Sequence, residues 1–415
     1  MRHILAAALV FSGCAGAVAD WPQFLGPGRS GISPDTAKLA KTWPASGPKV
    51  LWTVKVGPGF GGAAIVGNEV FLLDRENDQQ DVLRCLDLAD GKELWRFAYD
   101  APGKVDHNGS RGSPAVDDKY VFTVGPFGDF HCVDRKTHKA VWRKNLVKDF
   151  AASQPTWAVA QSPLLCKDLV AVAPCGKDAG IVAIKKDSGE VAWQSDPCGG
   201  MQYVSAMPMK IDGVEQIAAC GNTGKDATTV LSVDAATGKT LWKFDKWGCS
   251  TPIPSPMHVG DGKVFITGGY NAGSVMIQVR KKGAQWSVGE LWRLGARECG
   301  SQIHNPLVWE GHLYIDNNEN GKNLGMICLD MDGKVAWRSK NPNCNLGGQI
   351  IADGMIYKVD GSKGMLFLIE PTPESFKVVA QAKLLDGGEI WAPLAISSGK
   401  LVLRDQAQMK CLDVK

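Results

Sequence analysis

The sequence lacks the features that would mark a nucleic-acid-binding or membrane-spanning protein. Its 46 Lys and Arg residues nearly balance its 43 Asp and Glu residues, the formal net charge is +3, and no Lys/Arg run stands out. Binding to a phosphate backbone needs a concentrated basic face, so nucleic acid is not an expected partner. After residue 19 no apolar run reaches the roughly 18–20 residues that span a bilayer, so no transmembrane helix is expected.

Signatures of several enzyme classes are missing as well. The sequence holds no Ser-His-Asp order, phosphate-cradling glycine loop or His-Glu-x-x-His motif in a usable context, so the mechanisms that these motifs carry are not expected. No Cys-x-x-Cys-His motif is present, which means that a covalently bound c-type haem is not expected. The 12 cysteines include no adjacent pair.

The first nineteen residues have the pattern of an export signal. Residues 1–3 are a basic start, residues 4–11 are apolar, and residues 17–19 form a small-x-small cleavage site before Asp20. The alternative is a lipoprotein signal in which Cys14 carries the lipid. In both cases the mature chain is exported, to the periplasm or the cell envelope.

The main feature that is present is an internal repeat. The segment Asp-Leu-Ala-Asp-Gly-Lys-Glu-Leu-Trp-Arg at residues 87–96 returns at 134–143, 185–194, 234–243 and 330–338. Each copy reads as a strand end, a turn, and then a strand that carries a Trp. A period of roughly 40–50 residues with four short strands per unit is the signature of a β-propeller blade. The blade Trp residues are Trp52, Trp95, Trp142, Trp193, Trp242, Trp292 and Trp337.

The inner hairpin of each repeat can be counted independently of its Trp. Asp-Gly and related pairs supply the positive φ that two-residue hairpins require. Eight such turns occur, at residues 67–68, 117–118, 167–168, 212–213, 261–262, 310–311, 353–354 and 398–399. The outer strands also number eight, because residues 376–379 form a degenerate copy without Trp.

The two ends of the chain complete each other. Residues 391–414 hold three strands without a fourth, and residues 49–54 form a fourth strand without its three. Pairing them closes the ring and removes exposed sheet edges. We therefore predict an all-β, monomeric, eight-bladed β-propeller of four-stranded antiparallel blades over residues 49–415, closed by the N-terminal strand. Residues 20–48 are expected to form an extended lead-in over the ring, with aromatic side chains in a surface groove.

Two sets of side chains in the repeat are expected to be structural. The blade Trp residues are large and flat with an N–H donor, which suits them to wedging between neighbouring sheets. Four cysteines share one position in the third strand, where other repeats have Ala183 and Ser232. A position that takes small residues indicates inert core thiols. These thiols are Cys85, Cys132, Cys328 and Cys411.

The best copy of the repeat, Asp-Ala-Ala-Thr-Gly-Lys-Thr-Leu-Trp at residues 234–242, resembles the tryptophan-docking repeat of pyrroloquinoline-quinone (PQQ)-like propellers. Residues 21–27, residues 112–116, and Trp157 with residues 161–165 look like an exported bacterial branch of that family. The family holds quinoprotein alcohol dehydrogenases and also non-enzymatic propellers such as the BamB-type outer-membrane assembly lipoprotein. The resemblance covers essentially the whole mature chain and implies the fold rather than an activity.

The resemblance to quinoproteins fails where their chemistry resides. Those dehydrogenases are considerably longer, many stack the quinone on a disulfide between adjacent cysteines, and they hold calcium with a carboxylate and amide set and use an Asp base. No position of this sequence matches these features. We expect an exported binding or scaffold module, without catalytic residues, that holds an envelope protein or a small-molecule ligand on its funnel face. The alternative is a PQQ- or metal-dependent periplasmic oxidoreductase with PQQ and calcium as cofactors.

A second set of cysteines lies in loops that lead from an outer strand to the next inner strand, and we expect it on one face near the central funnel. Disulfides are permitted in an exported protein, so three interpretations stay open: unpaired small residues, one or two disulfides between blades, or a thiolate metal site. The last lacks the grouped Cys-x-x-Cys spacing of such sites. The set is Cys198, Cys249, Cys299 and Cys344.

The same loops carry polar and aromatic residues just before the inner strands. Inner strands that converge on an axis place these side chains around one funnel, and propellers commonly bind ligands in such a concavity. The alternative is that they bond to loop backbone and solvate the channel mouth. His107 and His304 are the strongest acid–base or metal candidates, although a loop His more often only forms hydrogen bonds. The candidates are His107, Arg111, Trp157, Gln161, Tyr203, Gln302, His304, Asn305, Gln349 and Trp391.

Overall fold

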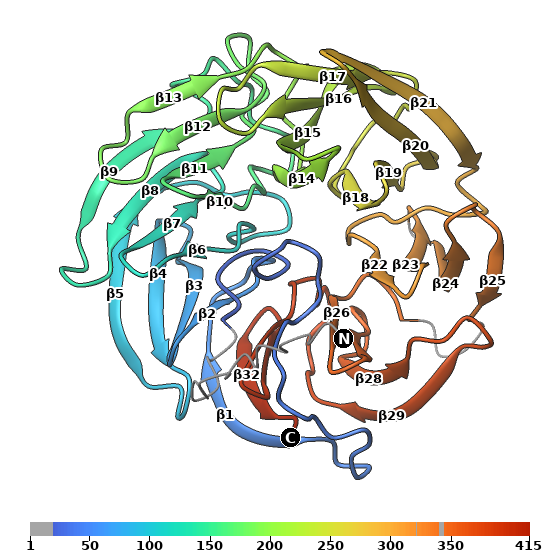
Figure 1. The fold of residues 1–415 in the computed structure, drawn as a ribbon. Coiled ribbons are helices and arrows are strands. Elements are labelled where there is room, and N and C mark those ends of the chain that lie inside the picture. Colours follow the sequence, from blue (N-terminus) through green and yellow to red (C-terminus); the bar gives the residue numbers. More distant parts are fainter. Residues whose placement is uncertain (1–19, 321, 340–343) are drawn as a thin grey trace, which may run out of the picture.

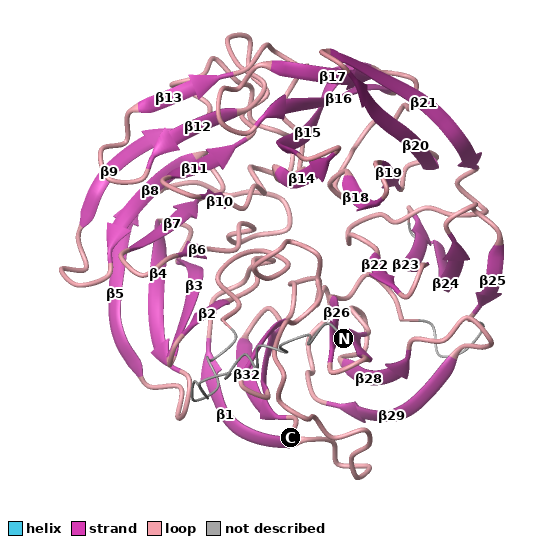
Figure 2. Ribbon diagram, in the orientation of Figure 1, coloured by secondary structure: helices cyan, strands magenta, loops and turns pink. Residues whose placement is uncertain are grey.

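Eight antiparallel sheets of four strands each form a closed ring, which confirms the predicted eight-bladed propeller (Figure 1). The structure is a computed structural model that describes residues 20–320, 322–339 and 344–415. The proposed export signal and Cys14 lie outside the described residues. Figure 2 shows strands and loops and no helix in the described part of the chain, and within it no helix is long and apolar enough to cross a membrane.

Seven blades are built from four consecutive strands that run in sequence order from the axis to the rim, and in the eighth the first strand of the chain forms the rim (Figure 1). The inner strands are β2 (Ala64–Val66), β6 (Ala115–Val116), β10 (Leu164–Cys166), β14 (Met207–Ile211), β18 (Met257–Gly260), β22 (Leu307–Trp309), β26 (Gln349–Ala352) and β30 (Ala395–Ser397). The second strands are β3 (Glu69–Glu76), β7 (Tyr120–Val124), β11 (Leu169–Val172), β15 (Val214–Gly224), β19 (Lys263–Gly268), β23 (His312–Glu319), β27 (Met355–Val359) and β31 (Lys400–Arg404).

The outer half of each blade completes the sheet. The third strands are β4 (Gln80–Asp87), β8 (Asp129–Asp134), β12 (Val182–Lys185), β16 (Ala227–Asp234), β20 (Gly273–Lys282), β24 (Lys322–Asp330), β28 (Met365–Glu370) and β32 (Gln408–Asp413). The rim strands are β5 (Glu93–Asp100), β9 (Ala140–Asn145), β13 (Val191–Gln194), β17 (Thr240–Phe244), β21 (Gln285–Leu294), β25 (Val335–Arg338), β29 (Lys377–Lys383) and β1 (Lys49–Lys55).

The eight inner hairpins turn at the predicted residues. At Asp212 and Gly213 the φ angles are 47° and 80°, the left-handed pair that a two-residue hairpin needs to match the strand twist. The hairpin between β6 and β7 also turns at the predicted residues, but neither Asp117 nor Asp118 has a positive φ angle. The Asp117 carboxylate closes this turn instead. That Oδ1 accepts hydrogen bonds from the amides of Lys119 at 2.9 Å and Tyr120 at 2.8 Å.

The ring is closed by the first strand pairing with the last. Strand β1 pairs antiparallel with β32, and Trp52 lies opposite Cys411. This confirms that the N-terminal strand supplies the rim of the C-terminal blade. Other blade Trp residues face the core thiols in the same way, since Cys85 lies opposite Trp95 and Cys132 opposite Trp142. Burial raises the pKa of Cys411 to about 12, so this thiol is inert at neutral pH.

Six of the seven blade Trp residues contact the outer turn of the following blade, whereas Trp242 donates from Nε1 to Gln216 Oε1 of its own blade at 2.8 Å. The indole Nε1 of Trp52 donates a hydrogen bond of 3.0 Å to the carbonyl of Leu88. A Cβ on Gly91 would lie 2.8 Å from the same indole, so the glycine lets the Trp52 ring pack directly on this turn. His138 replaces that glycine in the next blade and stacks on Trp95 with ring centroids 4.5 Å apart. The Trp residues therefore join neighbouring blades.

Residues 21–33 of the predicted lead-in, here called the plug, lie at the axis of the ring. The plug enters the axis beside β2, where Trp21 exchanges two backbone hydrogen bonds of 2.8 Å with Ile65, and leaves beside β26, where Ser33 donates to the Ile351 carbonyl at 2.8 Å. Figure 1 shows this blue loop in the middle of the ring. Trp21 is 1% exposed, so its indole is buried in the core and not in a surface groove.

One arginine fastens the plug to the far side of the axis. The Arg29 guanidinium is buried and donates hydrogen bonds to the carbonyls of Ala206 at 2.6 Å, Ser162 at 3.0 Å and Pro163. Gln23 contacts the same region, because its Oε1 accepts from the Leu165 amide at 3.0 Å. No carboxylate is bonded to this cation in the described residues, and burial lowers the pKa of Arg29 to about 9. The plug is thus held by backbone carbonyls at the entrances of β10 and β14.

Candidate functional site

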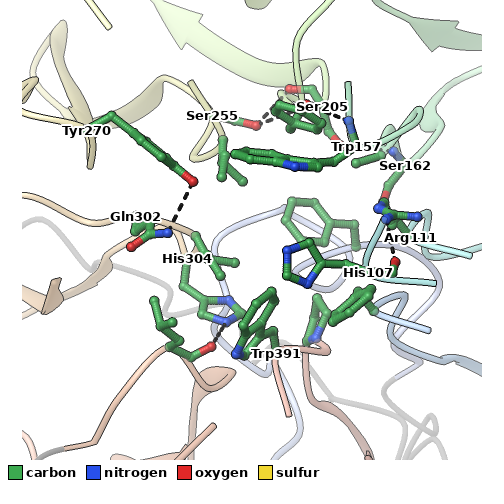
Figure 3. A pocket seen from close by; sticks show the side chains of 18 of the residues that line it. His107, Arg111, Trp157, Ser162, Ser205, Ser255, Tyr270, Gln302, His304 and Trp391 are labelled. Atoms are coloured by element: carbon green, nitrogen blue, oxygen red, sulfur yellow. Dashed lines mark hydrogen bonds between the residues drawn. The ribbon is translucent and has the colours of Figure 1, made fainter. Parts of the chain in front are cut away.

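Two kinds of loop meet at one end of the ring and enclose an axial funnel: the connections between blades and the turns between second and third strands. In an antiparallel blade the connection from the rim strand to the next blade and the turn between the second and third strands lie at the same end. A cavity of about 580 Å³ opens there (Figure 3), which is within the roughly 300–1,000 Å³ of small-molecule sites. Its lining is Phe24, Phe60, His107, Arg111, Trp157, Ala160, Ser162, Tyr203, Ser205, Ile253, Ser255, Tyr270, Gln302, Ile303, His304, Asn320, Leu346, Trp391 and Pro393.

One wall of the funnel is a stack of aromatic rings. Trp157 stacks on Tyr203 with centroids 5.5 Å apart and an interplanar angle of 30°, and Tyr270 lies 6.1 Å away on a tilted plane. The Tyr203 hydroxyl accepts a hydrogen bond of 3.0 Å from the backbone amide of Trp157. That bond joins loops from two blades and fixes the indole plane against the tyrosine.

The opposite wall is built around Trp391. Its ring lies 5.2 Å from Phe60 and 5.5 Å from the imidazole of His107, while His107 also meets Trp157 edge-on at 6.3 Å. Figure 3 shows Trp157 and Trp391 on opposite sides of the cavity with His107 beside both. The guanidinium of Arg111 lies 5.5 Å from the Phe60 ring. Two indole faces therefore border one opening.

The polar groups of this wall are held by local bonds. His107 has a left-handed φ of 53°, and its Nδ1 lies 3.0 Å from Oε1 of Glu389. Arg111 donates to the carbonyls of Gly109 at 2.7 Å and Asp106 at 2.6 Å, and to that of His107. Burial lowers the pKa of Arg111 to about 10. The arginine therefore fastens the loop that carries His107 and stays charged at neutral pH.

His304 is a buried hydrogen-bonding residue. Its Nε2 lies 2.9 Å from the carbonyl of Leu346, so this nitrogen carries the proton and donates. Burial, and then the positive charge of Lys358, lower the pKa of His304 to about 3. The imidazole is uncharged at physiological pH. It therefore suits a fixed wall residue that donates one hydrogen bond, and not a general acid.

A buried ion pair supports the Leu346 side of the funnel. Lys358 Nζ lies 2.8 Å from Asp316 Oδ2 and also donates to the carbonyl of Gly347. Both side chains are at most 1% exposed. The pair therefore holds the loop next to Leu346 in place. Removing one partner would leave an uncompensated buried charge.

Seven of the ten predicted ligand-binding residues line the funnel: His107, Arg111, Trp157, Tyr203, Gln302, His304 and Trp391. The other three are buried between the inner strands and outside this lining. Gln161 bonds the amide of Ala173 at 2.8 Å, Asn305 bonds the carbonyl of Ser255 at 2.7 Å, and Gln349 bonds the carbonyl of Asn305 at 3.2 Å. These three side chains bond to backbone groups, which is the alternative role that the sequence left open for the loop residues.

Several lining residues were not among the sequence candidates. Tyr270 and Asn320 follow β19 and β23, in turns between second and third strands, and strand alternation places these turns on the funnel face. Phe60 precedes β2, in the stretch that opens the first blade. Phe24 belongs to the plug and had no repeat to place it. The order of the strands could have placed Tyr270, Asn320 and Phe60 on the funnel face. No sequence pattern could have placed Phe24 there.

The second cysteine set does not converge on one point. Cys198 Sγ contacts Cys175 Sγ at 3.5 Å, Cys249 lies 3.7 Å from the carbonyl of Gly269, and Cys299 accepts a hydrogen bond of 3.3 Å from Ser274. Cys344 is buried. Across the described ranges, no group of three or more His, Cys, Asp or Glu side chains could hold a metal ion. The geometry therefore gives no support to a thiolate metal site.

The lining does not fit calcium-bound PQQ. Protein-bound calcium takes roughly six to eight oxygen ligands, with Asp or Glu carboxylates among them. The part of the funnel that the structure describes presents hydroxyl, amide, imidazole and guanidinium groups, and no Asp or Glu side chain lines it. A carboxylate base aimed at a substrate is missing from the same described lining. The described lining is therefore that of an aromatic cavity with a few neutral polar groups and one arginine.

A family model matches most of the chain. The model described as outer membrane protein assembly factor BamB matches residues 78–225 and 225–407. These matches cover six of the eight blades in full, the outer two strands of the first blade and the inner two strands of the last.

The chain is also similar to a curated relative and to solved structures. It is 23% identical over 309 residues to the quinoprotein alcohol dehydrogenase PedH of Pseudomonas putida, a match that covers 66% of this chain and 48% of that protein. The chain thus spans about half the length of this relative. The quinohemoprotein alcohol dehydrogenase of Comamonas testosteroni superposes with a TM-score of 0.66 at 14% identity, over 95% of this chain and 80% of the other.

A second solved structure is BamB from Moraxella catarrhalis. It superposes with a TM-score of 0.57 at 13% identity, over 88% of this chain and 99% of the other. At these identities the structural matches establish the fold alone. The lining of the funnel has to decide between binding and catalysis.

Proposed function

Because the chain belongs to the PQQ-like β-propeller family, whose matching model is described as outer membrane protein assembly factor BamB, we propose that it is an exported, non-catalytic binding module. Its funnel receives a ring-bearing apolar group, presented by a small molecule or by a partner protein of the cell envelope. The observation that carries this proposal is the presence of two indoles, Trp157 and Trp391, on opposite sides of a cavity that carboxylates do not line in the described structure.

The composition of the lining favours binding over turnover. Aromatic side chains bury large areas with little loss of rotamer freedom, which is why they dominate recognition sites. The serines at 162, 205 and 255 and the amide of Gln302 add a few polar groups, and such groups orient a ligand. Their hydroxyls and amides form no nucleophile–base pair among the hydrogen bonds of the site.

The alternative is a PQQ-dependent oxidoreductase, which the dehydrogenase relatives favour. The test is a titration of metal-stripped protein with PQQ, with and without calcium, followed by Trp fluorescence and quinone absorbance. We expect no calcium-dependent binding. Saturable, calcium-dependent binding together with reduction of an artificial electron acceptor in the presence of alcohols would overturn the proposal.

A second arm tests the funnel directly with an anilinonaphthalene sulfonate dye as a ring-bearing probe. The wild-type protein should bind the dye with a single class of sites. The Trp391→Ala variant should bind it at least about tenfold more weakly, because a stacked aromatic contact is worth roughly 0.5–1.5 kcal/mol beyond the area that it buries. The matched control is Trp286→Ala, which removes a rim-strand Trp of β21 far from the axis. Equal loss in both variants would place the dye elsewhere.

A further inference from the structure

Two thiols of the third blade are in van der Waals contact and sealed from water. Cys175 Sγ and Cys198 Sγ lie 3.5 Å apart, and the two residues are 2% and 3% exposed. Cys175 lies in the loop between β11 and β12, and Cys198 lies in the loop between β13 and β14. They are 23 positions apart in the sequence and are brought together by the fold of one blade.

We propose that Cys175 and Cys198 form a disulfide when the chain folds in an oxidising compartment. A disulfide places its sulfur atoms about 2.0 Å apart, so each sulfur has to move by less than about 1 Å from its present position. The proposal rests on export of the chain, because cytosolic thiols are kept reduced.

The neighbouring thiols have other contacts. The Cys220 carbonyl lies 3.9 Å from Cys175 Sγ, so it is the backbone of Cys220 that faces the pair in this contact. Cys249 packs against the carbonyl of Gly269, and Cys299 bonds to Ser274. The sulfur atom of Cys198 contacts that of Cys175 at 3.5 Å, and this contact favours a bond within the third-blade region over a bond between blades.

The oxidation balances as a thiol–disulfide exchange. One thiolate attacks the disulfide of an oxidant and forms a mixed disulfide, and the second thiolate displaces the oxidant's remaining sulfur. Two S–H bonds are lost and one S–S bond forms, while two electrons and two protons leave on the oxidant as a pair of thiols. The oxidant belongs to the class of protein or glutathione disulfides.

The order of events follows from burial. The attacking species is the thiolate, and the neighbouring Cys198 thiol and burial raise the pKa of Cys175 well above its ordinary value. A dissolved oxidant also has no access to sulfur atoms that are almost fully buried. The bond must therefore form while the third blade is still open, and once closed it is protected from reductants.

The disulfide would restrain a loop that lines the funnel. The loop that begins after β13 carries Cys198 and continues to Tyr203 and Ser205, both of which line the cavity. Tyr203 in turn holds the backbone of Trp157. Joining Cys198 to the loop of Cys175 thus anchors the segment that positions one aromatic wall.

The test is peptide mapping after refolding. Protein unfolded and reduced in denaturant is refolded in a glutathione redox buffer, denatured again, alkylated and digested without reductant. We expect the Cys175 and Cys198 peptides to be linked and Cys85, Cys132 and Cys249 to be alkylated. Recovery of Cys175 and Cys198 as alkylated peptides, or a link from either to Cys220 or Cys249, would overturn the proposal. Protein isolated from an oxidising compartment gives the same readout if refolding is incomplete.

A stability measurement provides an independent readout. The midpoint of thermal unfolding should be higher for oxidised than for reduced wild-type protein, and this gap should vanish in Cys175→Ala. The matched control is Cys132→Ala, since Ala183 occupies the equivalent slot of the third blade. The control should keep the gap between its oxidised and reduced forms. A gap that persists in Cys175→Ala contradicts the assignment. These results do not depend on what the funnel binds.

Discussion

Arg29 Nη1 donates a hydrogen bond of 2.6 Å to the carbonyl of Ala206, a residue 177 positions further along the chain. The same guanidinium holds the carbonyls of Ser162 and Pro163. One side chain of the plug therefore connects the N-terminal segment with the entrances of the third and fourth blades, below the aromatic funnel.

Replacing Arg29 with Met should lower the free energy of unfolding by about 3 kcal/mol, because each buried carbonyl left without a partner costs roughly 1–3 kcal/mol. Urea denaturation followed by Trp fluorescence measures the change. Arg143→Met is the control, since Arg143 is an exposed residue of β9, and its replacement should change stability by less than about 0.5 kcal/mol. A loss below about 1 kcal/mol in Arg29→Met would contradict the role given to the plug.

Gly238→Ala should be more damaging than Gly213→Ala, although both positions have left-handed φ angles, of 73° and 80°. A Cβ at Gly238 would lie 2.4 Å from the Trp193 ring, whereas a Cβ at Gly213 meets nothing within 4 Å. The left-handed angle alone costs roughly 1–2 kcal/mol, and the clash adds roughly 1–3 kcal/mol. Chemical denaturation of both variants measures the difference, and equal losses would show that the indole contact is not tight.

Stability should fall as the pH drops below about 6.5, and His304 should contribute to that fall. Its pKa is about 3 in the folded protein against 6.5 in the unfolded chain. Between these values the unfolded state binds the proton and the folded state does not, so stability is lost by up to about 1.4 kcal/mol per pH unit. His304→Gln keeps a donor for the Leu346 carbonyl and cannot titrate. Its unfolding free energy should depend less steeply on pH from 6.5 to 4 than that of the wild type, and an unchanged slope would contradict burial of a neutral imidazole.

Tyr203→Phe should loosen the aromatic wall. The variant removes the acceptor of the Trp157 amide, at a cost of about 1 kcal/mol. Hydrogen exchange at that amide, measured by mass spectrometry of the peptide around residue 157, should become faster. Tyr270→Phe is the control, because the Tyr270 hydroxyl accepts from the Gln302 side chain at 3.2 Å and not from a backbone amide. Unchanged exchange in Tyr203→Phe would show that another contact holds the indole.

The fold could be predicted because the repeat units can be counted directly in the sequence. The inner turns and the outer strands, seven with a Trp and one without, give two independent counts of eight. The incomplete blade at each end of the chain then requires closure of the ring. The paired strands β1 and β32 confirm that reasoning. These features depend on short-range patterns, which a sequence shows directly.

The plug and part of the funnel could not be predicted in the same way. Residues 20–48 contain no repeat, so nothing in their sequence shows that Arg29 reaches carbonyls more than 130 positions away. The direction of a loop side chain also depends on its backbone, as at His107, whose φ is 53°. For this reason the loop spacing identified His107 and Gln161 alike, although only His107 lines the cavity.

Closure by β1 and β32 also sets the order in which a newly made chain can reach its final form. The first strand has no partner until residues 408–413 have been synthesised and delivered. Any chain interrupted earlier exposes two unpaired edges, and such edges associate with other chains. The protein thus depends on residues 408–413 to complete its fold. Chains truncated before these residues should be degraded or aggregate instead of persisting as shorter propellers.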